Sequence, residues 1–261
     1  MVAFKVKDLP VETKKVHESQ NIWRRKNWEK TLSENGNDIE KLIDKIRLFD
    51  TWKTKLLKID VAKILIPEIF MDAYVSIHFA GYALYKYAHM SLRSELETAL
   101  RLVFFSTHSI EFKWWLNDDN NDKDWYSTTS DYPYVWGKRY SYFEHLENIK
   151  SFEKKCGDDE KKLFGGKKYG IKGLYTELSE YIHSGRGHFQ TRPDRVSPKY
   201  DHDQFEIWCY IHEKVQMYIH IMLVLGFAEE FKKMSSTNRN KILDIGIGDD
   251  YKEEIKETLG I

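Results

Sequence analysis

The segment between residues 91 and 108 holds the side chains whose types and spacing best suit chemistry. Arg93, Glu97 and Arg101 are four residues apart, so a helix would stack them on one face and let Glu97 pair with either arginine. His108 follows Arg101 where that helix should end. A guanidinium offers several donors to a phosphate, and an imidazole exchanges a proton near neutral pH. The pattern favours metal-free phosphoryl chemistry, and the alternative is a structural ion-pair ladder.

A second polar cluster lies in the string LYTELSEYIHSGRGH, which begins at residue 174. Ser179 and His183 are four residues apart on one face of a predicted helix, and Arg186 and His188 follow its expected C-cap. If this helix end meets the end of the first helix, guanidinium and imidazole groups from both would face one groove. The alternative is that cations near a helix C-terminus stabilise its dipole by about 0.3 to 1 kcal/mol.

The strings LRSELETALRLVFF, THSIEFKWW and LYTELSEYIHSG resemble the HEPN superfamily of helical prokaryotic proteins, over about a third of the chain. The motif of that family is an Arg separated from a His by four to six residues. Arg101 and His108 match it at the upper limit, with Leu102 where a polar residue usually follows the Arg. The string around Ser179 and His183 is more similar to non-catalytic members. The resemblance implies a small helical bundle, often dimeric, and in many members a ribonuclease of a defence or toxin system.

The mechanism that the resemblance implies needs neither a metal nor a cofactor. The RNA 2′-hydroxyl attacks its neighbouring phosphate, His108 or His183 moves the proton, and Arg101 or Arg186 holds the phosphate. General acid–base catalysis of this kind contributes about 10²- to 10⁴-fold. A homodimer would bring two copies of the Arg–His pair together. The side chains expected to bind the substrate are Arg93, Glu97, Ser179, Arg186 and His188.

Two other functions stay open. The first is a non-catalytic protein-interaction module of a defence or toxin–antitoxin system, in which the aromatic-rich region between Trp114 and Phe143 binds a protein partner. The second is a small-molecule-binding bundle with an apolar pocket at Trp114 and Trp115. The chain has 41 Lys plus Arg and 41 Asp plus Glu, so it has no net field that would attract RNA. This balance favours the protein partner.

The sequence predicts a cytoplasmic protein. Cys156 and Cys209 lie in unlike contexts and are interpreted as free thiols of a reducing compartment. Residues 1–15 lack the apolar run of a signal peptide, and the apolar stretch 218–231 is too short to cross a bilayer. His212 and His220, without a third converging ligand, are expected to be core histidines and not a metal site.

Helical periodicity runs through most of the chain. Apolar residues three or four apart predict a helix over 39–66, which Pro67 should end or restart. A nearly all-apolar helix follows to about residue 89, and the Ser94–Glu97 capping box would start the next, unless one bent helix spans both. Further helices are predicted over 140–155, 174–185, 204–234, 237–244 and 249–259.

The predicted fold is therefore all-α, a helical bundle of about seven or eight helices with long loops. The chain is expected to be a single domain over residues 1–261. Its predicted parts are a bundle of 38–114 and 138–234, loops at 117–131 and 187–201, and a C-terminal helical appendage over 235–261.

Overall fold

The structure is a computed structural model that describes residues 11–117, 142–157, 162–164, 170–182 and 198–261. Within these ranges the chain forms helices and no strand, which confirms the predicted all-α bundle. Eight of the helices are nine residues or longer, in agreement with the expected number.

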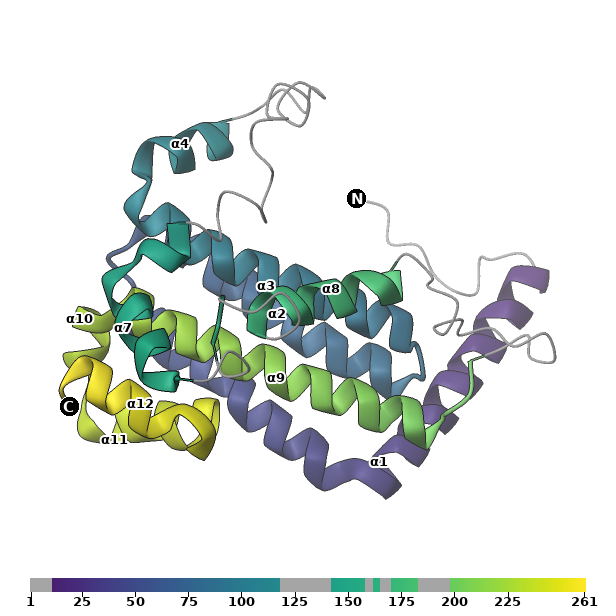
Figure 1. Cartoon of the computed structure of the whole chain (residues 1–261). Helices are drawn as coiled ribbons and strands as arrows, with labels where there is room; N and C mark the ends of the chain where they lie inside the picture. The colour runs from purple at the N-terminus through teal and green to yellow at the C-terminus, as the bar shows by residue number, and fades with distance from the viewer. Residues whose placement is uncertain (1–10, 118–141, 158–161, 165–169, 183–197) are drawn as a thin grey trace.

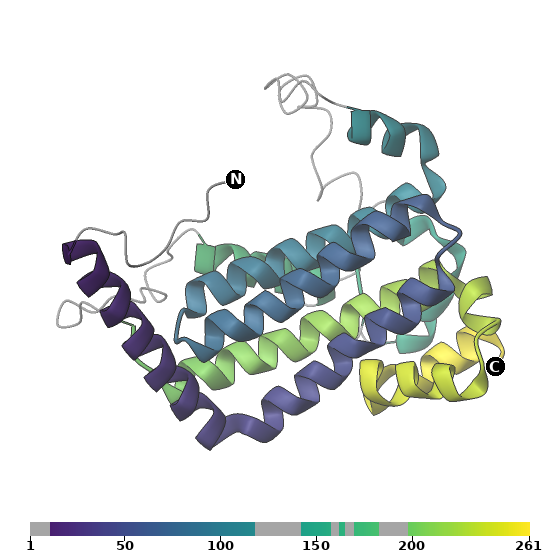
Figure 2. The ribbon, with the colours of Figure 1, turned by 180° about the vertical axis from the view of Figure 1, so that it is seen from behind.

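Four long helices form the centre of the molecule. The second half of α1(Val11–Lys55) packs against α2(Asp60–Gly81) and α9(His202–Gly226), and α3(Tyr85–Thr107) packs against the same two helices (Figures 1 and 2). All residues from Tyr218 to Leu225 of α9 are buried, because other helices surround this stretch. Asp201 is the N-cap of α9, since its side chain accepts a hydrogen bond of 3.2 Å from the backbone N–H of Gln204.

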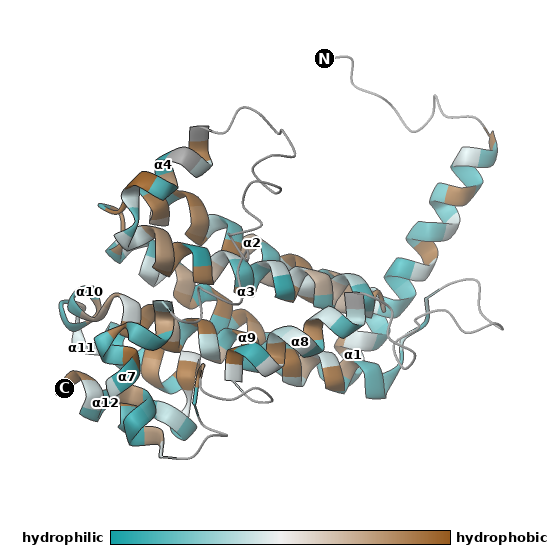
Figure 3. Ribbon diagram, turned by 45° about the horizontal axis from the view of Figure 1, so that its top comes forward, coloured by the Kyte–Doolittle hydropathy of each residue, from teal (hydrophilic) through white to brown (hydrophobic). Residues whose placement is uncertain are grey.

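The first half of α1 was not predicted as a helix and projects from the bundle as an arm, mostly hydrophilic (Figure 3). The helix bends at Asn35, whose backbone leaves helical geometry. The Asn35 amide donates to the Tyr200 hydroxyl at 2.7 Å, and Asn27 donates to the carbonyls of Tyr82 and Pro198 at 3.2 and 3.1 Å. Buried amides therefore fix the base of the arm to the α2–α3 turn and to the segment before α9.

The breaks between the first helices differ from the prediction. Pro67 lies inside α2, and the chain instead turns between Lys55 and Asp60. Proline removes one hydrogen bond to the carbonyl of Lys63, which is exposed, so water can satisfy that oxygen. The expected start at Ser94 is also wrong, because α3 runs without interruption from Tyr85. The break falls at the turn before Tyr85, where Ala83 has a φ of 61°.

Shorter helices pack at one end of the bundle. The C-terminal ones follow the predicted segments closely, and their apolar side chains continue the same buried cluster that begins at Ile39 and ends at Leu259. Tyr251 joins them to the rest, with its ring 6.0 Å from Phe152 and 6.5 Å from Tyr218. The elements at this end are α4(Ser109–Asn117), α7(Glu147–Cys156), α10(Ala228–Lys232), α11(Ser236–Lys241), the π-helical η4(Ile242–Ile247) and α12(Asp249–Leu259).

The remaining helix, α8(Gly170–Ile182), lies along α3 (Figure 1). Residues 118–131 and 187–197 of the two predicted loops lie outside the described residues, and residues 198–201 are non-helical as expected. One helix of the described part, α2, is long and apolar enough to cross a membrane, and 44% of its most apolar stretch is buried against the rest of the chain.

Candidate functional site

One face of α3 carries the predicted ladder. Because α3 is a single continuous helix, Arg93, Glu97 and Arg101 stack one turn apart. The Arg93 Nε donates to Glu97 Oε1 at 3.1 Å, and an Arg101 terminal nitrogen lies 3.5 Å from Glu97 Oε2. The pattern recognised in the sequence is thus a real ion-pair ladder in which one carboxylate lies between two guanidinium groups.

Tyr175 of α8 completes this cluster. Its hydroxyl donates to Glu97 Oε1 at 2.9 Å and accepts a hydrogen bond from Arg93, whose guanidinium also lies 4.5 Å above the ring. Sequence reasoning missed Tyr175, although it stands four residues before the candidate Ser179 on the same helix face. We call Arg93, Glu97, Arg101 and Tyr175 the charge ladder.

The members of the charge ladder are engaged to different degrees. Arg93 and Glu97 use their polar atoms on each other and on Tyr175, and their side chains are 23% and 19% exposed. Arg101 is 32% exposed, and its one ion pair with a described residue is the long contact to Glu97. Arg101 is therefore the guanidinium with donors available for a phosphate, while Arg93 is a structural link between α3 and α8.

His108 closes the C-terminal end of α3 two turns beyond Arg101. Its Nδ1 lies 2.9 Å from the Phe104 carbonyl oxygen, and its ring stacks on Phe104 at 4.0 Å with the edge of Tyr142 at 5.0 Å. Nδ1 also lies 3.0 Å from the Thr107 hydroxyl, which can donate or accept. Because the Phe104 carbonyl oxygen only accepts, its contact favours the tautomer with the proton on Nδ1 and the lone pair of a neutral ring on Nε2. No described residue bonds to Nε2, which is free to accept a proton.

The two predicted polar clusters do not meet along the described helices. α8 runs antiparallel to α3, since Tyr175 contacts Arg93 and Tyr181 stacks on His89 at 3.8 Å. The described end of α8, at Ile182, thus lies near the start of α3. His108 is 19 residues from His89 along the helix, which corresponds to about 28 Å. The described end of α8 and the end of α3 that carries His108 therefore lie at opposite ends of α3.

The residues of the second cluster are only partly described. The Ser179 hydroxyl donates to the Tyr175 carbonyl at 2.7 Å, a bond within its own helix, and its side chain is half-buried. His183, Arg186 and His188 lie outside the described residues.

A separate set of polar groups on α9 is buried, with His212 against α2 and His220 against α1. His212 and His220 are core histidines as predicted: His212 Nε2 lies 3.4 Å from the Ala73 carbonyl oxygen, and His220 Nδ1 accepts from the Trp52 indole at 3.3 Å. Burial lowers the pKa of His212 to about 4 and that of His220 to about 3. Among the described residues, no group of three or more His, Cys, Asp or Glu side chains is placed to hold a metal ion.

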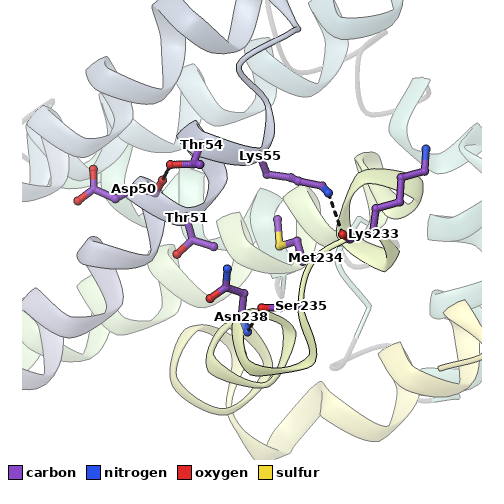
Figure 4. A pocket seen from close by; sticks show the side chains of 8 residues that line it. All are labelled: Asp50, Thr51, Thr54, Lys55, Lys233, Met234, Ser235 and Asn238. Carbon is purple, nitrogen blue, oxygen red and sulfur yellow. Dashed lines mark hydrogen bonds between the residues drawn. The ribbon is translucent and has the colours of Figure 1, made fainter.

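A polar pocket of about 450 Å³ lies between the end of α1 and the start of α11 (Figure 4). Its polar groups are largely committed to local bonds, since the Lys55 ammonium donates to the Lys233 carbonyl at 2.9 Å and the Thr54 hydroxyl donates to the Asp50 carbonyl at 2.9 Å. No residue of the charge ladder lines it. This pocket therefore adds nothing to the candidate site on α3.

No protein-family model matches the chain, and no curated protein or solved structure is significantly similar to it. The chemistry of the candidate site therefore rests on Arg101, His108 and their surroundings.

Proposed function

We propose that the protein is a HEPN-like, metal-independent endoribonuclease of a prokaryotic defence or toxin system, with Arg101 and His108 as its catalytic residues. The observation that carries the proposal is the state of these two side chains. They share one face of α3 two turns apart, Arg101 has uncommitted donors, and His108 has its Nδ1 anchored and its Nε2 open. A fixed tautomer and an available cation are the two requirements for proton transfer beside a phosphate.

In the proposed reaction, His108 Nε2 takes the proton from the RNA 2′-hydroxyl. The 2′-oxygen then attacks the adjacent phosphorus, and the bond from phosphorus to the 5′-oxygen breaks. The 5′-oxygen leaves with a proton from a second imidazole, which is His108 of a second copy of the chain. The products are a 2′,3′-cyclic phosphate and a 5′-hydroxyl. Arg101 offsets the negative charge that develops on the phosphate oxygens.

The rest of the charge ladder supports this assignment as positioning groups. Glu97 holds Arg101 through one long contact of 3.5 Å, which a phosphate can replace. Arg93 and Tyr175 both donate hydrogen bonds to Glu97, so its carboxylate stays paired when Arg101 turns to a phosphate. The expected substrate-binding role of Arg93 and Glu97 thus becomes an indirect one within the proposal.

The test is cleavage of single-stranded RNA in the presence of a metal chelator. We expect the wild-type chain to cleave and His108→Ala to lose about 10²-fold or more in rate, the usual contribution of general acid–base catalysis. His145→Ala is the matched control, because His145 is an exposed imidazole on the neighbouring segment. Circular dichroism checks that both variants keep their helices. Cleavage by His108→Ala at the wild-type rate would overturn the proposal.

A second candidate function, a non-catalytic module that binds a protein partner, is favoured by the α1 arm. Val11, Val16 and Ile22 on this arm are 65%, 56% and 56% exposed. The arm projects from the bundle and exposes these apolar side chains, which a protein partner would cover. Salt separates the two functions, because RNA binding through phosphates weakens steeply between 50 and 200 mM salt. RNA affinity that is absent or insensitive to salt would favour the protein partner.

A further inference from the structure

An apolar groove of about 520 Å³ opens at the end of the bundle where α2 begins, α3 ends and α4 follows. Its size falls in the range of small-molecule sites, which are about 300 to 1,000 Å³. Phe105 and Phe112 are nearly fully buried in its floor, while Ile64 and Leu116 remain 40% and 45% exposed. The apolar residues that line it are Ile59, Val61, Ile64, Phe105, Phe112 and Leu116.

The rim of the groove is polar and carries one uncommitted cation. Lys63 is paired with Asp60 at 2.7 Å, whereas Lys113 forms no ion pair with any described residue. The pKa of Asp60 is lowered by the hydrogen bond and charge of Lys63 and, to a smaller extent, by the charge of Lys113, so all three groups share this rim. The Ser109 hydroxyl, also on the rim, makes no hydrogen bond within the described part of the chain.

The apolar floor and the polar rim of the groove indicate which class of ligand it can bind. An apolar floor favours a hydrocarbon body, which would cover the exposed side chains of Ile64 and Leu116. A free ammonium and a free hydroxyl at the mouth favour a negatively charged head group with oxygen acceptors. We propose that this groove binds a small amphipathic carboxylate, with its head group at Lys113 and Ser109 and its alkyl chain between α2 and α4.

This site is separate from the proposed ribonuclease pair and does not depend on it. One function considered from the sequence was a small-molecule pocket at Trp114 and Trp115. Trp115 instead packs against Phe105 and Phe112 at 5.6 and 6.1 Å between ring centroids. The groove is lined by Phe112 and Leu116, other residues of the same helix.

The experiment measures binding of decanoate to the full chain by isothermal titration calorimetry, with decanol as the uncharged probe. We expect saturable binding of one decanoate per chain and about two- to fivefold weaker binding of decanol, because an exposed ion pair contributes a factor of this order. Lys113→Ala should weaken decanoate binding by about two- to fivefold and leave decanol unaffected. Lys241→Ala, at an exposed lysine away from the groove, is the control and should bind as the wild type does.

The apolar part of the site is tested separately. Leu116→Asn should weaken decanoate and decanol alike by about tenfold, since it removes apolar contact area from the wall. Ile207→Asn is its control, because Ile207 is similarly exposed, at 39%, on the distant start of α9. The absence of saturable decanoate heat overturns the proposal, and so does equal binding by wild type, Lys113→Ala and Leu116→Asn. Thermal unfolding curves verify that each variant is folded.

Discussion

Two glutamates of α3, separated by a single residue, lie in opposite environments. Glu95 is completely buried and accepts one hydrogen bond of 2.6 Å from the Gln216 amide. Glu97 is 19% exposed and lies between Arg93 and Arg101. Two residues correspond to about 200° around a helix, so the two side chains leave α3 on opposite sides. The helix thus separates a neutral polar interior from a charged surface.

The difference shows how the surroundings decide the charge of a carboxyl group. Burial raises the pKa of Glu95 well above its ordinary value, and the Gln216 hydrogen bond only partly opposes this. The group is therefore neutral, and no cation is bonded to it. Glu95 Oε2 and Gln216 Oε1 have no hydrogen-bond partner among the described residues, so each side chain of this pair keeps one unsatisfied oxygen in the core.

The largest effect is expected from removing the Glu95 side chain. Glu95→Ala leaves a cavity and an unpaired Gln216 amide in the core, so the free energy of unfolding should fall by about 3 kcal/mol. Glu97→Ala, on the other face, should lower it by about 1 kcal/mol, because water can solvate the two arginines. Urea unfolding followed by circular dichroism measures both. Equal losses of unfolding free energy in the two variants would contradict the difference between the buried face and the charged face of α3.

The same comparison predicts how stability depends on pH. With a raised pKa in the folded state, Glu95 contributes stability fully below the pKa of the unfolded carboxyl, near 4.5, and this contribution is lost as pH rises toward the folded value. The loss is about 1.4 kcal/mol per pH unit in that window. Glu95→Gln keeps the shape and the neutral state, so it should remove this slope. A slope unchanged in Glu95→Gln contradicts a neutral Glu95.

The buried histidines should produce the opposite dependence. Because burial lowers the pKa of His212 to about 4 and of His220 to about 3, both rings are neutral in the folded chain. Their contribution is fully present above the unfolded pKa, near 6.5, and is lost as pH falls toward the folded values, by about 1.4 kcal/mol per pH unit for each ring. His212→Gln should flatten the acid limb of the stability profile by about half. An acid limb that is unchanged in His212→Gln would contradict a neutral, buried His212.

The fold could be predicted from the sequence where apolar periodicity was strong. The start of α9 and the C-terminal helices lie close to the expected positions, but the helix expected over 204–234 ends at Gly226 and is followed, after Phe227, by the separate α10. The α1 arm could not be predicted, because few of its residues are buried and its stability comes from amides such as Asn27 and Asn35 bonded to distant segments. Pro67 misled the prediction, since surrounding helices hold α2 together despite one lost hydrogen bond.

The candidate site was predictable only within one helix. Spacing by four residues correctly places Arg93, Glu97 and Arg101 in contact, because that geometry is local. The direction of α8 against α3 is not local, and the expectation that the two helix ends meet failed for this reason. Spacing also could not predict that Glu95 is buried and Glu97 is exposed, because burial depends on which face of α3 packs against α9.

The smallest expected effect concerns Tyr175, which ties the charged face of α3 to α8. Tyr175→Phe removes the hydroxyl that donates to Glu97 and accepts from Arg93, but keeps the ring under the guanidinium. These atoms are partly solvated, so water replaces much of the lost interaction, and the free energy of unfolding should fall by about 1 kcal/mol. Ser179→Ala one turn away is the control and should change it by less than about 0.5 kcal/mol, because its hydroxyl only bonds its own helix. A loss in Tyr175→Phe as large as that in Glu95→Ala would mean that the charged face, like the interior, is closed to water.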